Sequence, residues 1–167
     1  MRENLPQRKQ IRLKEYDYSQ PGYYFVTICT QNRKCILSHI KLNKNCRGEV
    51  PPSPVKTEIG KQVAETIKYI VCKYNNIEID SYIIMPNHIH LIIQNTGEGG
   101  TSPLHKIITE IKTYTTKKYN ELNKTQQLKL WQRNYYEHVI RSEKEYYKIL
   151  EYIENNPINW EQDKYYN

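Results

Sequence analysis

His88 and His90 are the residues of this sequence whose type and spacing most directly suggest chemistry. They lie two positions apart in an apolar segment typical of a β-strand, in which alternate side chains project from the same face. Both imidazoles would therefore emerge together, with Ile89 on the opposite face. Imidazole is the commonest metal-binding side chain, and unpaired polar groups are costly among apolar neighbours. The pair predicts a metal site, although from this triplet alone two ordinary hydrogen-bonded histidines are the alternative.

Two histidines leave such a site incomplete. A structural zinc site needs four protein ligands, commonly thiolates, but the four cysteines form no CxxC pair and none lies near the histidines in sequence. An open site that is completed by water and phosphate oxygens suits Mg²⁺ or Mn²⁺ acting on a phosphodiester.

A second pair of candidate residues lies near the C-terminus. Tyr152 and Asn156 are four residues apart in a helical pattern, so they share one face, beside the apolar stripe. The amide oxygen of Asn156 would serve as a third, hard metal ligand, with the Tyr152 hydroxyl one turn away. The alternative is an amphipathic helix that simply ends in a polar cap before Pro157.

The elements that position these side chains follow from hydrophobic periodicity. In chain order they are strand 23–31, helix 57–74, strand 77–85, strand 88–94, helix 103–123, strand 131–141 and a last helix that ends at residue 156. Ser142 would cap the last helix, with Glu145 completing a capping box, and Pro157 would end it. Segment 32–54 would be a hairpin or a loop. The apolar stripe of the first helix would comprise Ile59, Val63, Ile67, Ile70 and Val71.

Strand–helix–strand twice over predicts an α/β fold of the ferredoxin-like sandwich type. An antiparallel sheet would carry two packed helices, and the C-terminal helix with its tyrosine would be an addition. The length of 167 residues fits one folded domain, which we place at 20–167, preceded by a polar, basic arm at 1–19. The net charge of +7 favours a polyanionic partner, and no apolar run is long enough to span a membrane.

Five segments, in this order, are similar to those of a known family. They are YDYSQPGYYFVTICTQNR (16–33), YIIMPNHIHLII (82–93), ITEIKTYTTKKYN (108–120), WQRNYYEHVIR (131–141) and EYIENNPINW (151–160). On these segments the chain resembles the REP-associated tyrosine transposases, a branch of the single-strand insertion-sequence transposases within the His-hydrophobic-His (HUH) endonucleases.

The resemblance implies a specific activity and a set of site residues. His88, His90 and Asn156 would bind Mg²⁺ or Mn²⁺, and Tyr152 would be the nucleophile. The family cuts single-stranded DNA at or beside hairpins of repeated extragenic palindromes, forms a transient 5′-phosphotyrosine and releases a 3′-hydroxyl that can rejoin strands. Tyr114 is the alternative nucleophile, because related transposases carry theirs on a helix after the HUH strand; its neighbour at i+4, Lys118, is no metal ligand.

DNA would be bound by basic side chains that follow phosphates, with tyrosines available for stacking on unpaired bases. The candidates are Arg12, Lys14, Lys106, Lys112, Lys117, Lys118, Arg133, His138 and Arg141. The protein would be cytoplasmic, associated with the nucleoid and not with a membrane, and either a monomer or a homodimer.

Two other functions are compatible with the residues alone. A non-catalytic nucleic-acid-binding module on a ferredoxin-like sheet would expose aromatic residues such as Tyr24 and Tyr82 on its strands. Another metal-dependent hydrolase would use the two histidines with water as the nucleophile.

Overall fold

The computed structural model describes residues 20–43, 50–97 and 103–166. The basic arm expected at 1–19, with Arg12 and Lys14, lies outside these residues. No helix within the described residues is long and apolar enough to cross a membrane.

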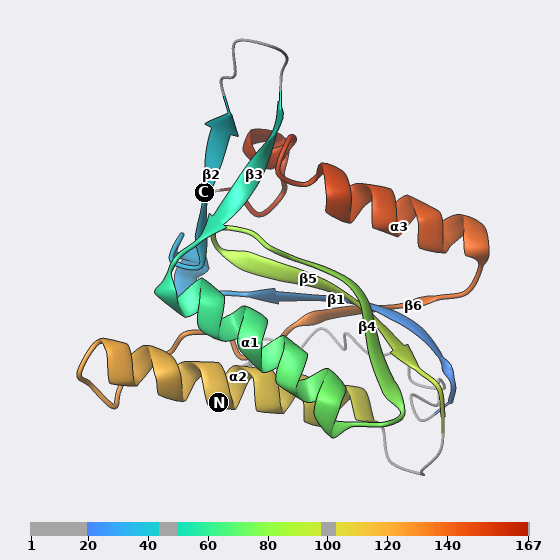
Figure 1. The fold of residues 1–167 in the computed structure, drawn as a ribbon, viewed down its shortest axis with the longest axis horizontal. Helices are drawn as coiled ribbons and strands as arrows, with labels where there is room; N and C mark the ends of the chain where they lie inside the picture. Colours follow the sequence, from blue (N-terminus) through green and yellow to red (C-terminus); the bar gives the residue numbers. More distant parts are fainter. Residues whose placement is uncertain (1–19, 44–49, 98–102, 167) are drawn as a thin grey trace, which may run out of the picture.

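Four strands form the main sheet, and all of its pairs are antiparallel. They are β1 (Gly22–Cys29), β4 (Ile77–Ile84), β5 (His88–Asn95) and β6 (Tyr136–Ile140), in the spatial order β4-β5-β1-β6. Helices α1 (Glu58–Lys73) and α2 (Pro103–Leu122) cover one face, and α3 (Glu143–Asn155) lies on the other (Figure 1). This order confirms the ferredoxin-like sandwich, with α3 as the added element.

The alternation of side chains along β5 divides the apolar interior into two cores. Ile89, Leu91 and Ile93 join the larger core, under α1 and α2. On the other face, Ile92 packs with Ile153 of α3 in a smaller core. Because His88 and His90 are an even number of residues from Ile92 along the strand, their side chains lie on the same face as Ile92, which α3 covers.

Caps fix where the helices begin, close to the expected ends. The Ser142 side chain accepts a hydrogen bond from Glu145 N, as the capping box predicts, and Asn156 is the C-cap of α3. Thr57 caps α1 and is not itself helical. The expected stripe of α1 is buried except for Val71, which is 40% exposed. That part of the prediction was wrong, because Ile70 already occupies the inward position of the last turn.

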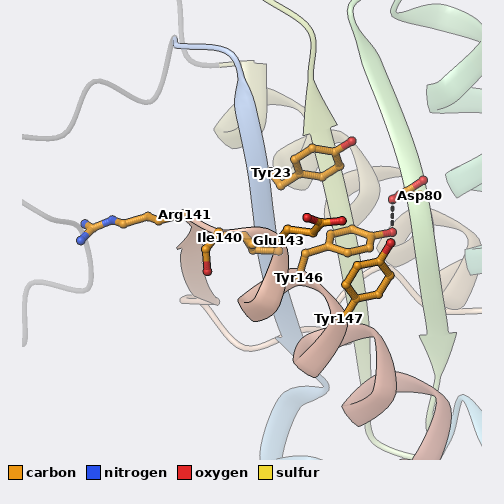
Figure 2. A pocket seen from close by; sticks show the side chains of 8 residues that line it. Tyr23, Asp80, Ile140, Arg141, Glu143, Tyr146 and Tyr147 are labelled. Atoms are coloured by element: carbon orange, nitrogen blue, oxygen red, sulfur yellow. Dashed lines mark hydrogen bonds between the residues drawn. The ribbon is translucent and has the colours of Figure 1, made fainter.

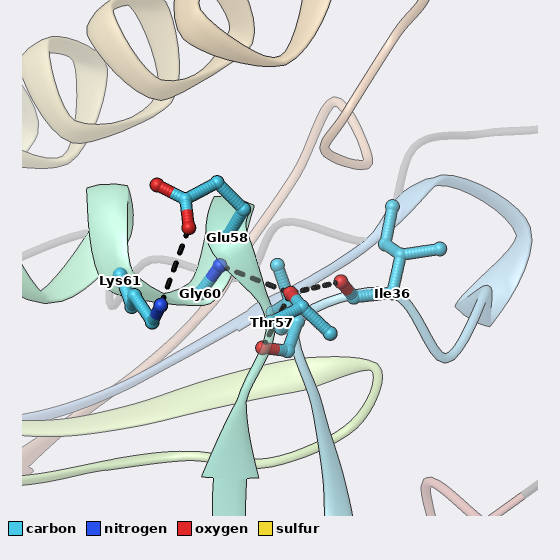
Figure 3. Close-up of polar contacts among 6 residues, drawn as sticks. Ile36, Thr57, Glu58, Gly60 and Lys61 are labelled. Atoms are coloured by element: carbon cyan, nitrogen blue, oxygen red, sulfur yellow. Dashed lines mark hydrogen bonds and ion pairs between the residues drawn. The ribbon is translucent and has the colours of Figure 1, made fainter. Parts of the chain in front are cut away.

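Segment 32–54 contains a hairpin, not an open loop. Its strands are β2 (Ser38–Asn43) and β3 (Val50–Lys56), and among the described residues they pair only with each other. Figure 3 shows how Thr57 joins this hairpin to α1: its hydroxyl donates to Ile36 O at 2.7 Å and accepts from Gly60 N at 3.2 Å. A Cβ atom on Gly60 would stand 1.9 Å from Leu37 O, so this close approach requires glycine.

Candidate metal centre

The two histidines at the start of β5 point at one another on the α3 face of the sheet. Their side chains are fully buried, and the distance between the two Nε2 atoms is 3.0 Å. The structure therefore brings together the imidazole pair that the spacing predicts.

Neighbouring oxygens hold the outer nitrogen of each ring. His88 Nδ1 lies 2.9 Å from Asn87 Oδ1, and His90 Nδ1 lies 2.8 Å from Thr27 Oγ1, on the adjacent strand β1. The Asn87 oxygen can only accept, so His88 Nδ1 carries the proton and its Nε2 presents a lone pair. An oxygen on the far nitrogen is the usual means by which proteins orient a metal-binding histidine.

Burial keeps both imidazoles neutral. Loss of solvation lowers the pKa of His88 to about 4, and it lowers the pKa of His90 well below its usual value. Both rings are therefore uncharged at neutral pH, which is the form that binds a cation.

Helix α3 contributes the other two residues that the sequence singled out. The Tyr152 ring lies 5.2 Å from the His90 ring, between centroids, and the Tyr152 side chain is 37% exposed. Asn156 is buried, one turn further along. Its Nδ2 donates to Asp163 Oδ2 at 2.6 Å, whereas its Oδ1 is buried and has no hydrogen-bond partner among the described residues. A buried acceptor without a donor is costly, so this oxygen is suited to a cation.

Asp163 completes the cluster from a part of the chain that the sequence analysis did not single out. It directly follows the short 3₁₀ helix η2 (Trp160–Gln162). Ligand atoms of His88, His90 and Asp163 all lie within 4.8 Å of one another. Two neutral imidazoles, a carboxylate and an unpaired amide oxygen make a nitrogen–oxygen donor set that fits a divalent cation such as Mg²⁺ or Mn²⁺.

The Tyr152 hydroxyl lies at the edge of this donor set. It donates to Asp163 Oδ2 at 3.1 Å, and burial together with the Asp163 charge raises its pKa. Tyr165 lies on the other side, with its ring centroid 4.7 Å from that of His88, and burial raises its pKa to about 12. Both phenols are thus protonated at neutral pH.

The predicted DNA-binding lysines are not part of this centre. Lys106, Lys112, Lys117 and Lys118 lie on α2, so the sheet separates them from the histidines. Lys112 donates to Arg133 O at 3.0 Å, and burial lowers its pKa. Lys118 is paired with Glu121 at 2.9 Å. These two contacts tie both side chains to the protein itself.

The other basic candidates within the described residues lie on β6 or beside its ends. Arg133 and Arg141 are exposed at the two ends of β6. His138 lies opposite Phe25 in the sheet and on the α3 side, where its Nε2 is 2.7 Å from Glu145 Oε1. His138 thus joins β6 to the first turn of α3.

Two of the alternatives left open by the sequence fit this geometry less well. Tyr114 is 50% exposed on α2, on the opposite side of the sheet from the histidines. Tyr24, which a strand-based nucleic-acid-binding module would expose, is buried in the larger core. Neither residue belongs to the candidate metal centre.

Sequence reasoning missed the oxygen partners and the basic groups of the centre. Thr27 had a usable signal, as a polar residue with the inward parity of an apolar strand. Asp163 and Lys164 had none, because the segment after Pro157 has no period. Lys164 Nζ lies 5.0 Å from the centroid of the Tyr165 ring, and Arg33 Cζ lies 5.6 Å from it. These two cations add positive charge beside the centre.

Comparison with known proteins places this arrangement in a family. Residues 18–156 match the family model described as "Transposase IS200 like". An uncharacterized protein of Haemophilus influenzae is 35% identical over 95% of this chain and 93% of its own length. A second Haemophilus influenzae protein, provisionally named a REP-associated tyrosine transposase, is 25% identical over 85% of this chain and 73% of its own.

A solved structure shares the fold. It is the structure of a REP-associated tyrosine transposase bound to a REP hairpin, with a TM-score of 0.61 and 23% sequence identity. The match covers 91% of this chain and 77% of that one. Since the family model spans β1 to the end of α3, and so includes both histidines, Tyr152 and Asn156, the chain belongs to the IS200-like transposase family.

Proposed function

We propose that this protein is a metal-dependent endonuclease and strand transferase that acts on single-stranded DNA at hairpins, with Tyr152 as its nucleophile. The observation that carries the proposal is the convergence of the buried His88 and His90 with the half-buried Asp163, whose carboxylate also accepts the hydrogen bond of the Tyr152 hydroxyl. The family, and the REP hairpin bound by the structural relative, support the choice of DNA hairpins as substrate.

We assign the ligand roles to His88, His90 and Asn156, with Asp163 as a further carboxylate ligand. Mg²⁺ or Mn²⁺, when bound there, would withdraw charge from the non-bridging phosphate oxygens and orient the phosphorus for in-line attack. Asn87 and Thr27 would keep the imidazoles in the binding orientation. Each of these residues already occupies its place in the fold through a hydrogen bond or burial.

Side chains of the protein itself would accept the proton and form the covalent bond to the cleaved strand. The Tyr152 oxygen attacks phosphorus and its proton passes to the Asp163 carboxylate, which already accepts the hydroxyl hydrogen bond at 3.1 Å. The bond from phosphorus to the 3′-oxygen breaks, and that oxygen leaves as a 3′-hydroxyl after taking a proton from solvent. The phosphodiester energy is kept in the tyrosine ester, so a 3′-hydroxyl can later attack it and rejoin the strand without ATP.

The positive groups beside the centre would hold the DNA backbone. Lys164 and Lys148 line the groove outside Tyr152, and Arg33 lies over Tyr165. We assign residues 20–167 to the catalytic domain and give the basic arm at 1–19 an accessory role in phosphate binding. The lysines of α2 would at most bind a distant part of the duplex, because the sheet separates them from Tyr152.

A labelled hairpin with single-stranded flanks tests the proposal. With Mn²⁺ or Mg²⁺ the wild-type protein should form an adduct that survives denaturing electrophoresis, and EDTA should abolish it. Mass spectrometry of the digested adduct should find the nucleotide on Tyr152. Tyr152→Phe should form no adduct, whereas the matched variant Tyr114→Phe should behave as wild type. An adduct on another tyrosine refutes the assignment, and cleavage without any adduct indicates a water nucleophile.

A further inference from the structure

A second hollow lies beside the first turn of α3, on the same face of the sheet as the candidate metal centre. Its volume is about 480 Å³, a size that can accept a nucleoside. Tyr23 of β1, Asp80 of β4 and Tyr146 of α3 contribute to its wall. Tyr23 precedes Thr27 on β1 by four residues, so the two side chains share a face about 13 Å apart.

Three tyrosines give this hollow flat aromatic surfaces. The Tyr146 ring is in edge contact with those of Tyr23 and Tyr147, with 5.4 Å between centroids in both pairs. Tyr147 is 57% exposed, which leaves part of its ring open to solvent. An exposed aromatic ring beside a DNA-cutting site is suited to stacking against an unpaired base.

Carboxylates make the second chemical feature of the hollow. Asp80 lies at a bulge in β4: Ile79 and Ser81 pair with successive residues of β5, and Asp80 is left without a paired residue on that strand. Bulges of this kind re-aim a side chain, and here Asp80 Oδ2 accepts a hydrogen bond from the Tyr146 hydroxyl. Figure 2 shows Asp80, Glu143 and the tyrosines converging, while Arg141 extends away from them.

This chemistry selects one kind of group. Two carboxylates repel a phosphate, so the hollow is not a backbone site. An ionised carboxylate only accepts hydrogen bonds, and it can take two parallel donors at once. Among the DNA bases, guanine alone presents two adjacent donors on its Watson–Crick edge, at N1 and the exocyclic amine.

The position along α3 joins the hollow to the candidate metal centre. From Tyr147 to Tyr152 the helix advances by five residues, or about 7.5 Å. Lys148, between them, lines the groove outside Tyr152, and Arg141 lies at the opposite rim of the hollow. Cations on both sides would hold the phosphates while the base turns inward.

We propose that the hollow formed by Tyr23, Asp80, Glu143, Tyr146 and Tyr147 binds one unpaired guanine of the DNA strand, a few nucleotides from the bond that Tyr152 cuts. The base stacks on Tyr147, and its two donors face the carboxylates. The position of the guanine relative to the cut rests on the proposed function, whereas the preference for guanine does not.

Binding measured without cleavage tests the preference. Fluorescence anisotropy in EDTA would compare thymine oligonucleotides that carry one central guanine, adenine, cytosine or inosine, the last lacking the exocyclic amine. The variants are Tyr147→Ala and Asp80→Asn, which keeps an acceptor for Tyr146. Tyr69→Ala is the matched control, since Tyr69 is 58% exposed on α1, on the other face of the sheet.

The wild-type protein should bind the guanine oligonucleotide about tenfold more tightly than the others. Tyr147→Ala should lose most of that gain, Asp80→Asn should lose the distinction between guanine and inosine, and Tyr69→Ala should change neither. Equal binding of all four oligonucleotides, or a guanine preference that survives both pocket variants, overturns the proposal.

Free 5′-GMP separates a base within a strand from a mononucleotide ligand. Competition only at much higher concentration than the oligonucleotide supports the strand, and equal affinity overturns it. Because EDTA prevents cleavage, these results are independent of the adduct experiment. A failure of Tyr152 as nucleophile would leave the guanine preference standing, and loss of that preference would leave the nucleophile assignment standing.

Discussion

Asp163→Asn is the sharpest test of the metal centre, because it removes one negative charge with almost no change of shape. In the wild-type protein Asp163 Oδ2 lies 2.6 Å from Asn156 Nδ2, and Asp163 Oδ1 accepts a hydrogen bond of 2.6 Å from Tyr165 N. The new amide can still accept from Tyr165, but its NH₂ group would face that of Asn156. We expect the Mn²⁺ affinity to fall about thirtyfold, within the range seen when a group that supports a metal site is removed.

That loss converts into a measurable change in thermal stability. At about 100 times its Kd, Mn²⁺ stabilises the wild-type fold by about 2.7 kcal/mol. For a domain of this length, 1 kcal/mol moves Tm by about 2–4 °C, so the wild-type Tm should rise by about 5–11 °C. At the same Mn²⁺ concentration the variant would be at about 3 times its Kd, which stabilises it by about 0.8 kcal/mol and raises Tm by about 2–3 °C.

The assay is differential scanning calorimetry with and without Mn²⁺, so that each variant serves as its own baseline. Glu161→Gln is the matched control, because Glu161 is an exposed carboxylate on η2 two residues earlier. It should keep the full wild-type rise. A Mn²⁺-dependent rise in Asp163→Asn equal to that of the wild-type protein would refute the inclusion of Asp163 in the metal centre.

Three further predictions concern the elements that position the centre. Gly60→Ala should lower the free energy of unfolding by about 1–3 kcal/mol, since the clash with Leu37 O outweighs the better helix propensity of alanine. Urea denaturation measures this change, and an unchanged midpoint would contradict the close approach. Ser142→Ala should cost about 1 kcal/mol by the loss of the cap, and Ser142→Gly only a few tenths. The pKa of the Glu145 carboxyl is lowered, mainly by the hydrogen bond that it accepts from Arg141 N. The ionised carboxylate therefore stabilises the fold above the pKa that glutamate has in the unfolded chain, and this stabilisation is lost as the pH falls through the lowered pKa. The Tm difference between wild type and Glu145→Gln should accordingly shrink on acidification.

The fold was largely predictable because its signals are local. Alternating or continuous apolar runs marked the four sheet strands, and Ser142 with Pro157 marked the ends of α3 to within a residue. The histidine pair followed from strand parity alone, since the period of a strand does not depend on its neighbours. The hairpin of β2 and β3 was less certain because prolines in β3 contradict an ordinary strand, and such a strand survives at the edge of a small sheet.

The rest of the centre was not predictable, because it depends on how distant segments meet. Thr27 reaches His90 only through the register of β1 on β5, and Asp163 reaches Asn156 only because the chain turns back after Pro157. The position of the α2 lysines relative to the histidines was equally unpredictable. Their spacing shows that they share a helix, but which face of the sheet that helix covers is decided by packing.

The chemistry of the centre explains why a cation and the tyrosine belong together. Without a cation, burial and the Asp163 carboxylate both raise the pKa of Tyr152, which would oppose the proposed attack by its oxygen. A divalent cation bound beside the same carboxylate would reverse the sign of that local field, and it would give the unpaired Asn156 oxygen a partner. One residue, Asp163, would thus link the proposed ligand set to the proposed nucleophile. For that reason we expect its replacement to weaken metal binding and adduct formation together, whereas replacement of Tyr152 by Phe should leave metal binding intact.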